Sequence, residues 1–309
     1  MQRYLARRLL YALMGVVGAT LVAFVASHLA PGDPVLLMLG DVNASPELVA
    51  SLRRQYGLDQ PAPIQYLIFV ANALRGDFGT SYQQLGRPVV QVIADGLPVS
   101  AQLGALSLLG AVALAVPIGV VAAVKQNSWL DYGAMFVALA GVSLPPFVLA
   151  TFLVLGLSVR LGWLPVAGLE TWQGWILPAV AIGLGPCALL ARIVRASMLD
   201  VLRQEYIVAA RAKGLSELAV LTRHGLRNAL FPAFTVVGLL VGRLVTGAFL
   251  IETLFNLPGV GRIAVNAVIN RDYPVVLGVT VLLGFTFALL SLIVDLLYGV
   301  LDPRVRVDA

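Results

Sequence analysis

The chain has 309 residues, of which 59% are hydrophobic and only 12% charged, and its formal net charge is +5. Soluble domains carry about 25% charged residues, so this deficit indicates a protein that folds in a lipid bilayer. The sequence offers no basic, aromatic-bearing soluble face, and a nucleic acid is therefore not expected as a partner.

Six segments are apolar and long enough to cross a hydrocarbon core of about 30 Å, which takes about 20 helical residues. They cover residues 9–30, 99–124, 132–159, 172–191, 232–251 and 273–294. A period-two alternation of polar and apolar residues is absent, so helices rather than a barrel are expected to satisfy the backbone in lipid. The sequence predicts an all-α integral membrane protein with six transmembrane helices in a single domain over residues 1–309.

The first span begins after several basic residues, as a secretory signal peptide does. Its apolar stretch is longer than a signal-peptide core, and no small-residue cleavage site stands out before Pro31. We therefore expect a retained helix rather than a cleaved signal.

Lysine and arginine are concentrated in the segments that would be cytoplasmic if the N-terminus lies inside. Positive residues favour the cytoplasmic side, so both termini are predicted to be cytoplasmic. The long loop after the first span, residues 31–98, is then external. Within it, Ser45 and Pro46 predict a helix that ends at Gly57, and a second helix is expected near residues 63–74. This external loop is either a surface for an external partner or a cap over the spanning helices.

Proline and glycine residues interrupt several of the predicted spans. Such breaks are tolerated where neighbouring helices or a cavity satisfy the freed carbonyl groups. They serve either helix packing or hinges. The interrupting residues are Pro117, Pro145, Pro146, Pro178, Gly183, Gly185 and Pro186.

Residues 205–232 form the only long, basic, amphipathic segment between two apolar runs. Gly214 is placed to end a first short helix in the left-handed conformation, and Ser216 to cap the start of a second. Pro232 is expected to open the next span, where its missing N–H does no harm. The sequence thus predicts a cytoplasmic helical hairpin over residues 197–231. Such a hairpin is either a docking surface for a partner or an amphipathic helix that lies on the membrane.

The chain lacks the motifs of an enzyme. A phosphate-binding P-loop needs a lysine followed by serine or threonine, whereas Lys125 precedes a glutamine and Lys213 a glycine. The G-x-G-x-x-A pattern that starts at Gly259 has no preceding strand, so a dinucleotide site is not expected. His28 and His224 fall at opposite ends of the predicted topology and cannot share a metal ion. We therefore expect no catalytic residue, no metal and no cofactor in this chain.

Arg243 is the only charged residue inside the six apolar segments. At 1.5 Å per helical residue it lies about 16 Å beyond Pro232, close to the bilayer midplane. A charge there costs at least about 2.5 kcal/mol, so the side chain is expected to face protein or water. Arg243 either lines a translocation pathway and attracts an anionic group, or bonds to carbonyl groups freed in a broken neighbouring helix.

The segment that begins at Glu205 reads E-Y-I-V-A-A-R-A-K-G-L-S and resembles the EAA loop of ABC importer membrane subunits, in the form found in oligopeptide and dipeptide permeases. Further motifs resemble the same family and keep its order over nearly the whole chain. They are P-G-D-P at 31–34, Y-G-L-D-Q-P at 56–61, G-D-F-G-T-S-Y at 76–82, E-T-L-F-N-L-P-G-V-G-R at 252–262, N-R-D-Y-P-V-V at 270–276 and D-L-L-Y-G-V-L-D-P-R-V-R at 295–306. Together they are specific for the first of the two permease subunits of peptide and nickel transporters. The chain departs from the general pattern at Tyr206, where the general EAA form has alanine, and at Arg243.

The resemblance implies a multi-pass permease subunit of the bacterial inner membrane, in an ATP-driven importer of dipeptides or oligopeptides. It implies a complex, embedded in membrane lipid, with a homologous second permease, two ABC ATPase subunits and an external substrate-binding protein. ATP and magnesium would bind to the ATPase subunits. The segment 205–232 would couple ATPase closure to alternating access. The coupling residues that the motif implies are Glu205, Ala209, Ala210, Lys213, Gly214 and Leu215.

Other functions fit parts of the same sequence. Similar permeases serve glutathione and nickel chelates, and substrate selection lies mostly in the external binding protein. From a different class, a stand-alone secondary carrier would need intramembrane carboxylates or inverted-repeat symmetry, and the sequence shows neither. A membrane scaffold that transports nothing fits the composition but leaves the hairpin without a role.

Overall fold

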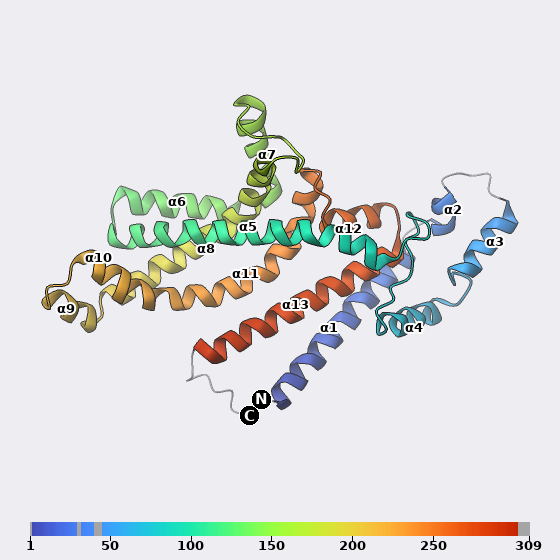
Figure 1. The fold of residues 1–309 in the computed structure, drawn as a ribbon, viewed down its shortest axis with the longest axis horizontal. Helices are drawn as coiled ribbons and strands as arrows, with labels where there is room; N and C mark the ends of the chain where they lie inside the picture. Colours follow the sequence, from blue (N-terminus) through green and yellow to red (C-terminus); the bar gives the residue numbers. More distant parts are fainter. Residues whose placement is uncertain (1, 30–31, 40–44, 302–309) are drawn as a thin grey trace. The chain divides into compact units, whose positions relative to one another are not determined.

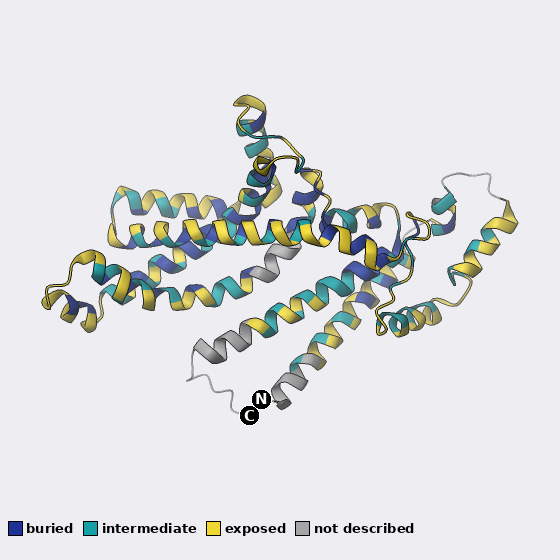
Figure 2. Cartoon of the chain, in the orientation of Figure 1, coloured by how far each residue is buried: buried dark blue, intermediate teal, exposed yellow. Residues whose placement is uncertain are grey.

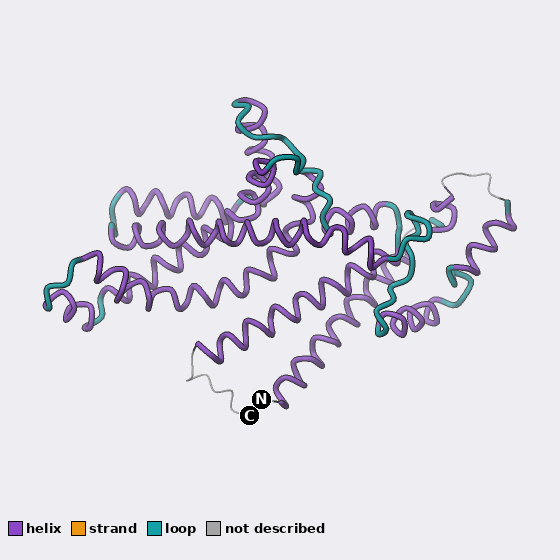
Figure 3. Tube along the Cα trace, viewed as in Figure 1, coloured by secondary structure: helices purple, strands orange, loops and turns teal. Residues whose placement is uncertain are grey.

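The computed structural model describes residues 2–29, 32–39 and 45–301, and the side chains of residues 2–7, 9, 37, 241–247 and 294–301 lie outside that description. The described chain consists of helices and connecting turns, and its extended pairing is an isolated bridge between Thr80 and Pro88. Figures 1 and 3 show this arrangement. The prediction of an all-α protein is confirmed.

The chain divides into two compact units. The first unit comprises Met1–Ser100, Pro258–Leu292 and Arg306–Ala309, and the second comprises Ala101–Leu257 and Ile293–Val305. The long helix α5 (Val89–Val124) contributes residues to both.

The first unit contains the N-terminal helix, the predicted external loop and the last helix. Its helices are α1 (Gln2–Leu29), α2 (Pro34–Leu39), α3 (Pro46–Gln55), α4 (Ala62–Ala73), α12 (Val260–Ile269) and α13 (Tyr273–Leu301). The start of α3 is as predicted: the Ser45 hydroxyl accepts a hydrogen bond from the Leu48 N–H at 3.3 Å. Gly57 follows α3 with a φ of 65°, which confirms its role in ending this helix. Helix α4 lies within two residues of its predicted position.

The segment between α11 and α13 contains a further helix, α12, which the sequence analysis did not identify. Val260, Ile263, Ala264 and Ala267 recur at helical spacing and pack in one apolar cluster with residues of α5 and α13. The start signal is absent from the sequence, since the capping position is a glycine and makes no side-chain hydrogen bond. Instead, the Ser100 hydroxyl of α5 accepts a hydrogen bond from the Val260 N–H at 2.8 Å.

A buried carboxylate joins the turn between α12 and α13 to the turn that follows α4. Asp272 is 3% exposed and accepts hydrogen bonds from the Ser81 hydroxyl, the Tyr82 N–H at 3.0 Å and the Gln83 N–H at 3.3 Å. Burial, and then the charge of Asp272, raise the pKa of the Tyr82 hydroxyl above its usual range. Two of the family-like motifs, at 76–82 and 270–276, therefore meet at one carboxylate.

The second unit is built around α8 (Ile176–Leu202), which packs against α5, α6 (Trp129–Ser143), α7 (Pro146–Leu153) and α11 (Arg227–Leu254). Small residues allow close approach. A Cβ added to Gly119 of α5 would lie 2.7 Å from the Ala191 carbonyl oxygen, and one added to Gly183 of α8 would lie 2.8 Å from that of Ser107. Gly183 therefore serves helix packing, and α8 continues unbroken through Pro186.

Four described helical segments are long and apolar enough to cross a membrane: Leu10–Leu29, Val89–Val124, Trp172–Leu202 and Tyr273–Ile293. Each of these four segments overlaps most of one predicted span. A bent pair of helices would make a fifth. The predicted span over residues 232–251 falls in α11, where residues 241–247 lie outside the described side chains. Six spans and the orientation in the membrane stay predictions.

The predicted third span, residues 132–159, is sharply bent in the structure. Helices Trp129–Ser143 and Pro146–Arg160 meet at 111°. Pro145 and Pro146 lie at the break, where Pro145 caps the second helix and Pro146 opens it. Because proline blocks helix continuation through its ring and its missing N–H, two in succession end α6 and start α7 in a new direction.

The long helices carry many exposed positions, drawn in yellow in Figure 2, and large apolar residues are among them. On α5, for example, Leu109 is 67% and Leu114 is 58% exposed. In water such a surface would be covered by another protein, whereas lipid tails satisfy it without a partner. The exposure pattern therefore agrees with an all-helical membrane protein.

We predict that Asp272→Asn destabilises the protein by about 2–3 kcal/mol, because three donors, two of them on the buried residues Ser81 and Tyr82, lose a carboxylate acceptor. The measurement is the unfolding midpoint of the purified protein in detergent. Asp77→Asn is the matched control, since the Asp77 carboxylate is exposed and accepts a single hydrogen bond, from the Gly79 N–H at 2.8 Å. Equal effects of the two substitutions would contradict the assigned role of Asp272.

Candidate functional site

The hairpin predicted over residues 197–231 is present in the second unit. Its first helix, α9 (Glu205–Ala212), follows α8, and its second begins with α10 (Glu217–Ala219) and continues through the π-helical turn η3 (Val220–Leu226) into α11. In Figure 1, α9 and α10 lie at one tip of this unit. The candidate site is thus an extension of two membrane-domain helices.

The turn of the hairpin has the conformation that the sequence predicts. Gly214 has a φ of 77°. The Gly214 N–H donates to the Arg211 carbonyl at 2.9 Å, and the Leu215 N–H donates to the Ala210 carbonyl at 3.4 Å. These two bonds form a Schellman motif, which satisfies the last carbonyl groups of α9. The Ser216 hydroxyl then accepts from the Ala219 N–H at 3.4 Å, which confirms its capping role.

The expected role of Pro232 is wrong, because this residue lies inside α11 rather than at its start. The helical path is already established over residues 217–231, so the second arm of the hairpin and the following helix are one continuous element. Pro232 cannot donate to the Asn228 carbonyl, but its fixed φ suits a helix. Ala229 and Ala233, on either side of this proline, are buried in the core of the second unit, and this packing supports the helix through Pro232.

The hairpin has a small apolar core of its own. Ile207 and Ala210 of α9 pack against Val220 of η3, and all three are buried, with Val201 and Leu202 at the end of α8 adding to the cluster. Polar contacts join the two arms as well. The Arg211 guanidinium donates to the Glu217 carboxylate at 2.7 and 3.3 Å across the turn.

The hydroxyl of Tyr206 accepts a hydrogen bond from the Asn228 side-chain amide at 3.0 Å. Tyr206 is the position at which the chain departs from the general EAA pattern, and its hydroxyl links α9 to the start of α11. With the apolar core and the Arg211–Glu217 pair, this contact makes the hairpin a compact piece rather than a flexible loop.

The structure separates the predicted coupling residues by exposure. Ala210 is buried in the hairpin core, whereas the other members are exposed. The exposed members are Glu205, Ala209, Lys213, Gly214 and Leu215. All six lie on α9 and in the turn after it, so the structure brings them together.

Two exposed apolar residues of the hairpin were missed by the sequence analysis. Val208 is 59% and Leu218 is 72% exposed. Leu218 follows the charged Glu217, whereas Val208 lies in the apolar run I-V-A-A, so the neighbours of Val208 give no signal of its exposure. An exposed apolar side chain on a basic hairpin is suited to a protein contact.

Arg243 belongs to α11, but its side chain lies outside the described residues. The structure therefore places the Arg243 backbone within a helix of the second unit and does not bring the residue to the hairpin. Its predicted role in a pathway stays a prediction.

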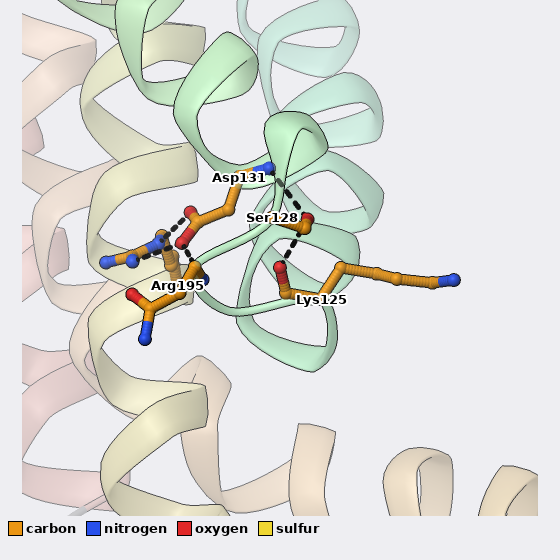
Figure 4. A network of polar contacts seen from close by, with 5 residues as sticks. Lys125, Ser128, Asp131 and Arg195 are labelled. Carbon is orange, nitrogen blue, oxygen red and sulfur yellow. Dashed lines mark hydrogen bonds and ion pairs between the residues drawn. The ribbon is translucent and has the colours of Figure 1, made fainter.

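An ion pair with a buried carboxylate was also missed by the sequence analysis. The Asp131 carboxylate, 1% exposed, accepts hydrogen bonds from Arg195 Nε at 2.5 Å and Nη2 at 2.6 Å. Asp131 is in the first turn of α6 and Arg195 is on α8, as Figure 4 shows. The carboxylate also accepts the Asn127 N–H at 3.0 Å, within the short turn that joins α5 to α6.

Comparison with known protein families decides what kind of protein carries this hairpin. Residues 115–307 match the family described as "Binding-protein-dependent transport system inner membrane component". Residues 1–104 match the description "Binding-prot-dependent transport system membrane comp, N-term". The chain belongs to this family of permeases.

Membership in this family establishes the broad function of the protein. The protein is a multi-pass inner-membrane permease subunit of an ABC importer, and it is not an enzyme. As a binding-protein-dependent component, it works with ATPase and binding-protein partners. The alternatives of a stand-alone carrier and a non-transporting scaffold are thereby excluded.

Among related proteins, the permease is similar to those named glutathione transport system permease protein GsiC. It is 40% identical over 306 residues to those of Shigella flexneri serotype 5b, Salmonella typhimurium and Escherichia coli K12, covering 99% of both chains in each case.

Solved structures show the same fold. A chain of the inward-facing MetNI methionine ABC transporter matches with a TM-score of 0.58 and 18% identity, covering 69% of this permease and 97% of that chain. A chain of an amino acid ABC transporter with histidines matches with a TM-score of 0.50 and 14% identity, covering 70% and 95%.

We predict that Ala210→Leu loosens the hairpin, because the larger side chain overpacks the contact with Ile207 and Val220 at a cost of about 1–3 kcal/mol. Limited trypsin digestion of the purified permease in detergent should then cut faster after Arg211 and Lys213. Ala209→Leu is the matched control: it adds the same group one residue earlier, on the exposed side. Equal cleavage rates in the two variants would show that the buried face of α9 does not hold the hairpin.

Proposed function

We propose that this permease serves an importer of glutathione or of similar short anionic peptides, and that its hairpin is the docking site of an ABC ATPase subunit. The substrate proposal rests on the relatives named glutathione permeases, which align over 99% of both chains. General dipeptide or oligopeptide import and nickel-chelate import are the competing proposals. The complex would contain this chain, a homologous second permease, two ATPase subunits and an external binding protein.

The observation that carries the coupling proposal is the construction of the hairpin. Its arms are joined by a buried core, by the Arg211–Glu217 pair and by the Schellman turn at Gly214. A hairpin whose arms are held together in this way moves as one piece when a partner displaces its tip. Its first arm leaves α8 and its second continues into α11, so movement of the tip displaces both helices.

Each coupling residue has a role that fits its position. Glu205 occupies the first turn of α9, where a negative charge suits the positive end of the helix. Ala209 and the exposed Val208 offer a low, apolar surface to a partner, while Ala210 holds the arms together. Lys213 and Leu215 flank Gly214 at the exposed tip. The ATPase would seat this tip in a surface cleft, and closure of the ATPase pair would switch access from outside to inside.

We predict that Gly214→Val abolishes the stimulation of ATP hydrolysis by the loaded binding protein, because a β-branched residue resists the left-handed conformation. Gly214→Asn should retain most of it, since asparagine tolerates that conformation. An added Cβ meets nothing within 4 Å, so strain in the backbone, not a clash, is the only local cost. The measurement is ATPase activity of the reconstituted complex.

Gly57→Val is the control for this experiment. Gly57 ends α3 with a φ of 65° and also has nothing within 4 Å of an added Cβ, but it lies in the other unit. It should leave the stimulation intact. Normal stimulation and ATPase binding in Gly214→Val would overturn the docking role of the hairpin.

For the substrate, we predict uptake of glutathione by proteoliposomes that contain the complete complex, ATP and the cognate binding protein. Glutathione carries two carboxylates and one ammonium group, so it is a net anion at neutral pH. Uptake of labelled glutathione should resist competition by excess neutral dipeptide. Efficient competition, or uptake of a nickel chelate in preference to glutathione, would favour the competing proposals.

The same assay examines Arg243, which we propose lines the translocation pathway and attracts a substrate carboxylate. Arg243→Gln should then reduce glutathione uptake, whereas Arg243→Lys should retain part of it because the positive charge remains. Full uptake with both variants would leave Arg243 with only a structural bond inside the helix bundle.

A further inference from the structure

The ion pair between Asp131 and Arg195 lies where three parts of the second unit meet. Asp131 opens α6, Arg195 lies on α8, and the Asn127 N–H that also binds the carboxylate belongs to the turn after α5. In the same turn, the Ser128 hydroxyl donates to the Lys125 carbonyl at 2.6 Å and accepts from the Asp131 N–H at 3.4 Å. Figure 4 shows that these contacts join the turn to α8 through one carboxylate.

Net stabilisation alone is a weak reason for such a pair. Removing the Asp131 carboxylate from water is costly, the Arg195 side chain is still 24% exposed, and such an ion pair often contributes no more than apolar residues of the same size would. The pair does restrain the relative position of its two residues, because two parallel N–H···O bonds are lost when either group moves by about an ångström. Asp131 and Arg195 are therefore suited to fixing the position of α8 against the α5–α6 turn.

Several of the surrounding helix contacts involve small residues. Gly119 of α5 lies against Ala191 and Val194 of α8, and Gly141 of α6 lies against Ala188 and Leu184. A glycine lets backbones approach closely but has no side chain to resist sliding along the helix axis. The bidentate pair adds such resistance at the end of these contacts.

Arg195 also lies near the hairpin along α8. From Arg195 to the end of α8 at Leu202, the helix runs about 10 Å without a break. Met198, which is fully buried in this stretch, contacts the second arm: a Cβ added to Gly225 of η3 would lie 3.4 Å from its terminal methyl carbon. The same length of α8 thus touches the α5–α6 turn through Arg195 and the hairpin through Met198.

We propose that Asp131 and Arg195 form a positioning pair that makes the α5–α6 turn move together with the hairpin, so that ATPase closure displaces α5 and α6 as well as α8 and α11. This inference rests on the proposed docking role of the hairpin. It assigns a transport role to two residues outside the segment 205–232 and outside the predicted pathway.

The first experiment measures coupling in the complete complex in nanodiscs, as stimulation of ATP hydrolysis by glutathione-loaded binding protein. Asp131→Asn should lower this stimulation about fivefold or more, at the lower end of typical coupling effects. In the double variant Asp131→Asn/Arg195→Gln no buried charge is left unpaired, so thermal stability should recover while stimulation stays low. A purely structural pair would recover both, and that result overturns the proposal. Asp95→Asn, which breaks the exposed Arg87–Asp95 pair, is the control and should change neither.

The second experiment keeps the pair intact and does not depend on the substrate. Spin labels are attached at Trp129→Cys, beside the α5–α6 turn and 80% exposed, and at Thr222→Cys, exposed on η3, in a Cys187→Ser background. The distance between the labels should be the same in the nucleotide-free complex and in the complex trapped with magnesium, ATP and vanadate. It should differ between these states once Asp131→Asn is added.

A distance that changes between the two states with Asp131 present shows that the turn and the hairpin move independently, and the proposal fails. It also fails if Asp131→Asn leaves the distance the same in both states. Failure of the docking role looks different, because the Gly214→Val complex would then bind and stimulate its ATPases normally. The two proposals are thus distinguished.

Discussion

The buried contact of Ile207 and Ala210 with Val220 determines how the candidate site can work. It holds α9 against the arm that continues into α11, so the turn at Gly214 is the tip of a packed structure and not a free loop. The Schellman bonds at Gly214 and Leu215 complete this arrangement by bonding to the last carbonyl groups of α9. A partner that pushes on the tip therefore acts on α8 and α11 directly. In the docking role proposed above, the exposed residues of the hairpin would contact the ATPase, while the buried ones hold its two arms together.

Local rules predicted the ends of helices well. Gly57 and Gly214 end their helices in the left-handed conformation, and Ser45 and Ser216 cap the helices that follow them, as the sequence indicated. These features depend on a few neighbouring residues, whose conformational preferences are strong enough to be read without the fold. The positions of apolar spans were predicted for a related reason, since the length of an apolar run is itself a local property.

Features that depend on distant residues were missed. Helix α12 begins at a glycine, and its apolar face is recognisable only against the residues of α5 and α13 that cover it. Pro232 was assigned to a helix start because the rule for proline ignores the preceding η3 and the packing around it. Neither Asp131 nor Asp272 stood out in sequence, because their partners lie 64 and 190 or so residues away. Within the hairpin, the sequence predicted the two helices and the turn between them but could not tell that Ala210 is buried and Ala209 exposed.

The two buried carboxylates show a common way of holding helices in this protein. In lipid, apolar contact alone gives little preference for one helix position over another, because lipid tails are as apolar as the side chains they replace. Asp131 and Asp272 each accept backbone N–H groups from a turn and a second contact from a distant side chain. Both lie at helix starts, where α6 and α13 begin, and leave the helix interiors to small residues and close packing. Polar contacts thus fix positions at these two helix starts, in addition to the apolar packing of the helix interiors. In the transport cycle proposed above, this arrangement would keep each of these helix starts attached to a defined neighbour while the rest of the helix depends on apolar contacts.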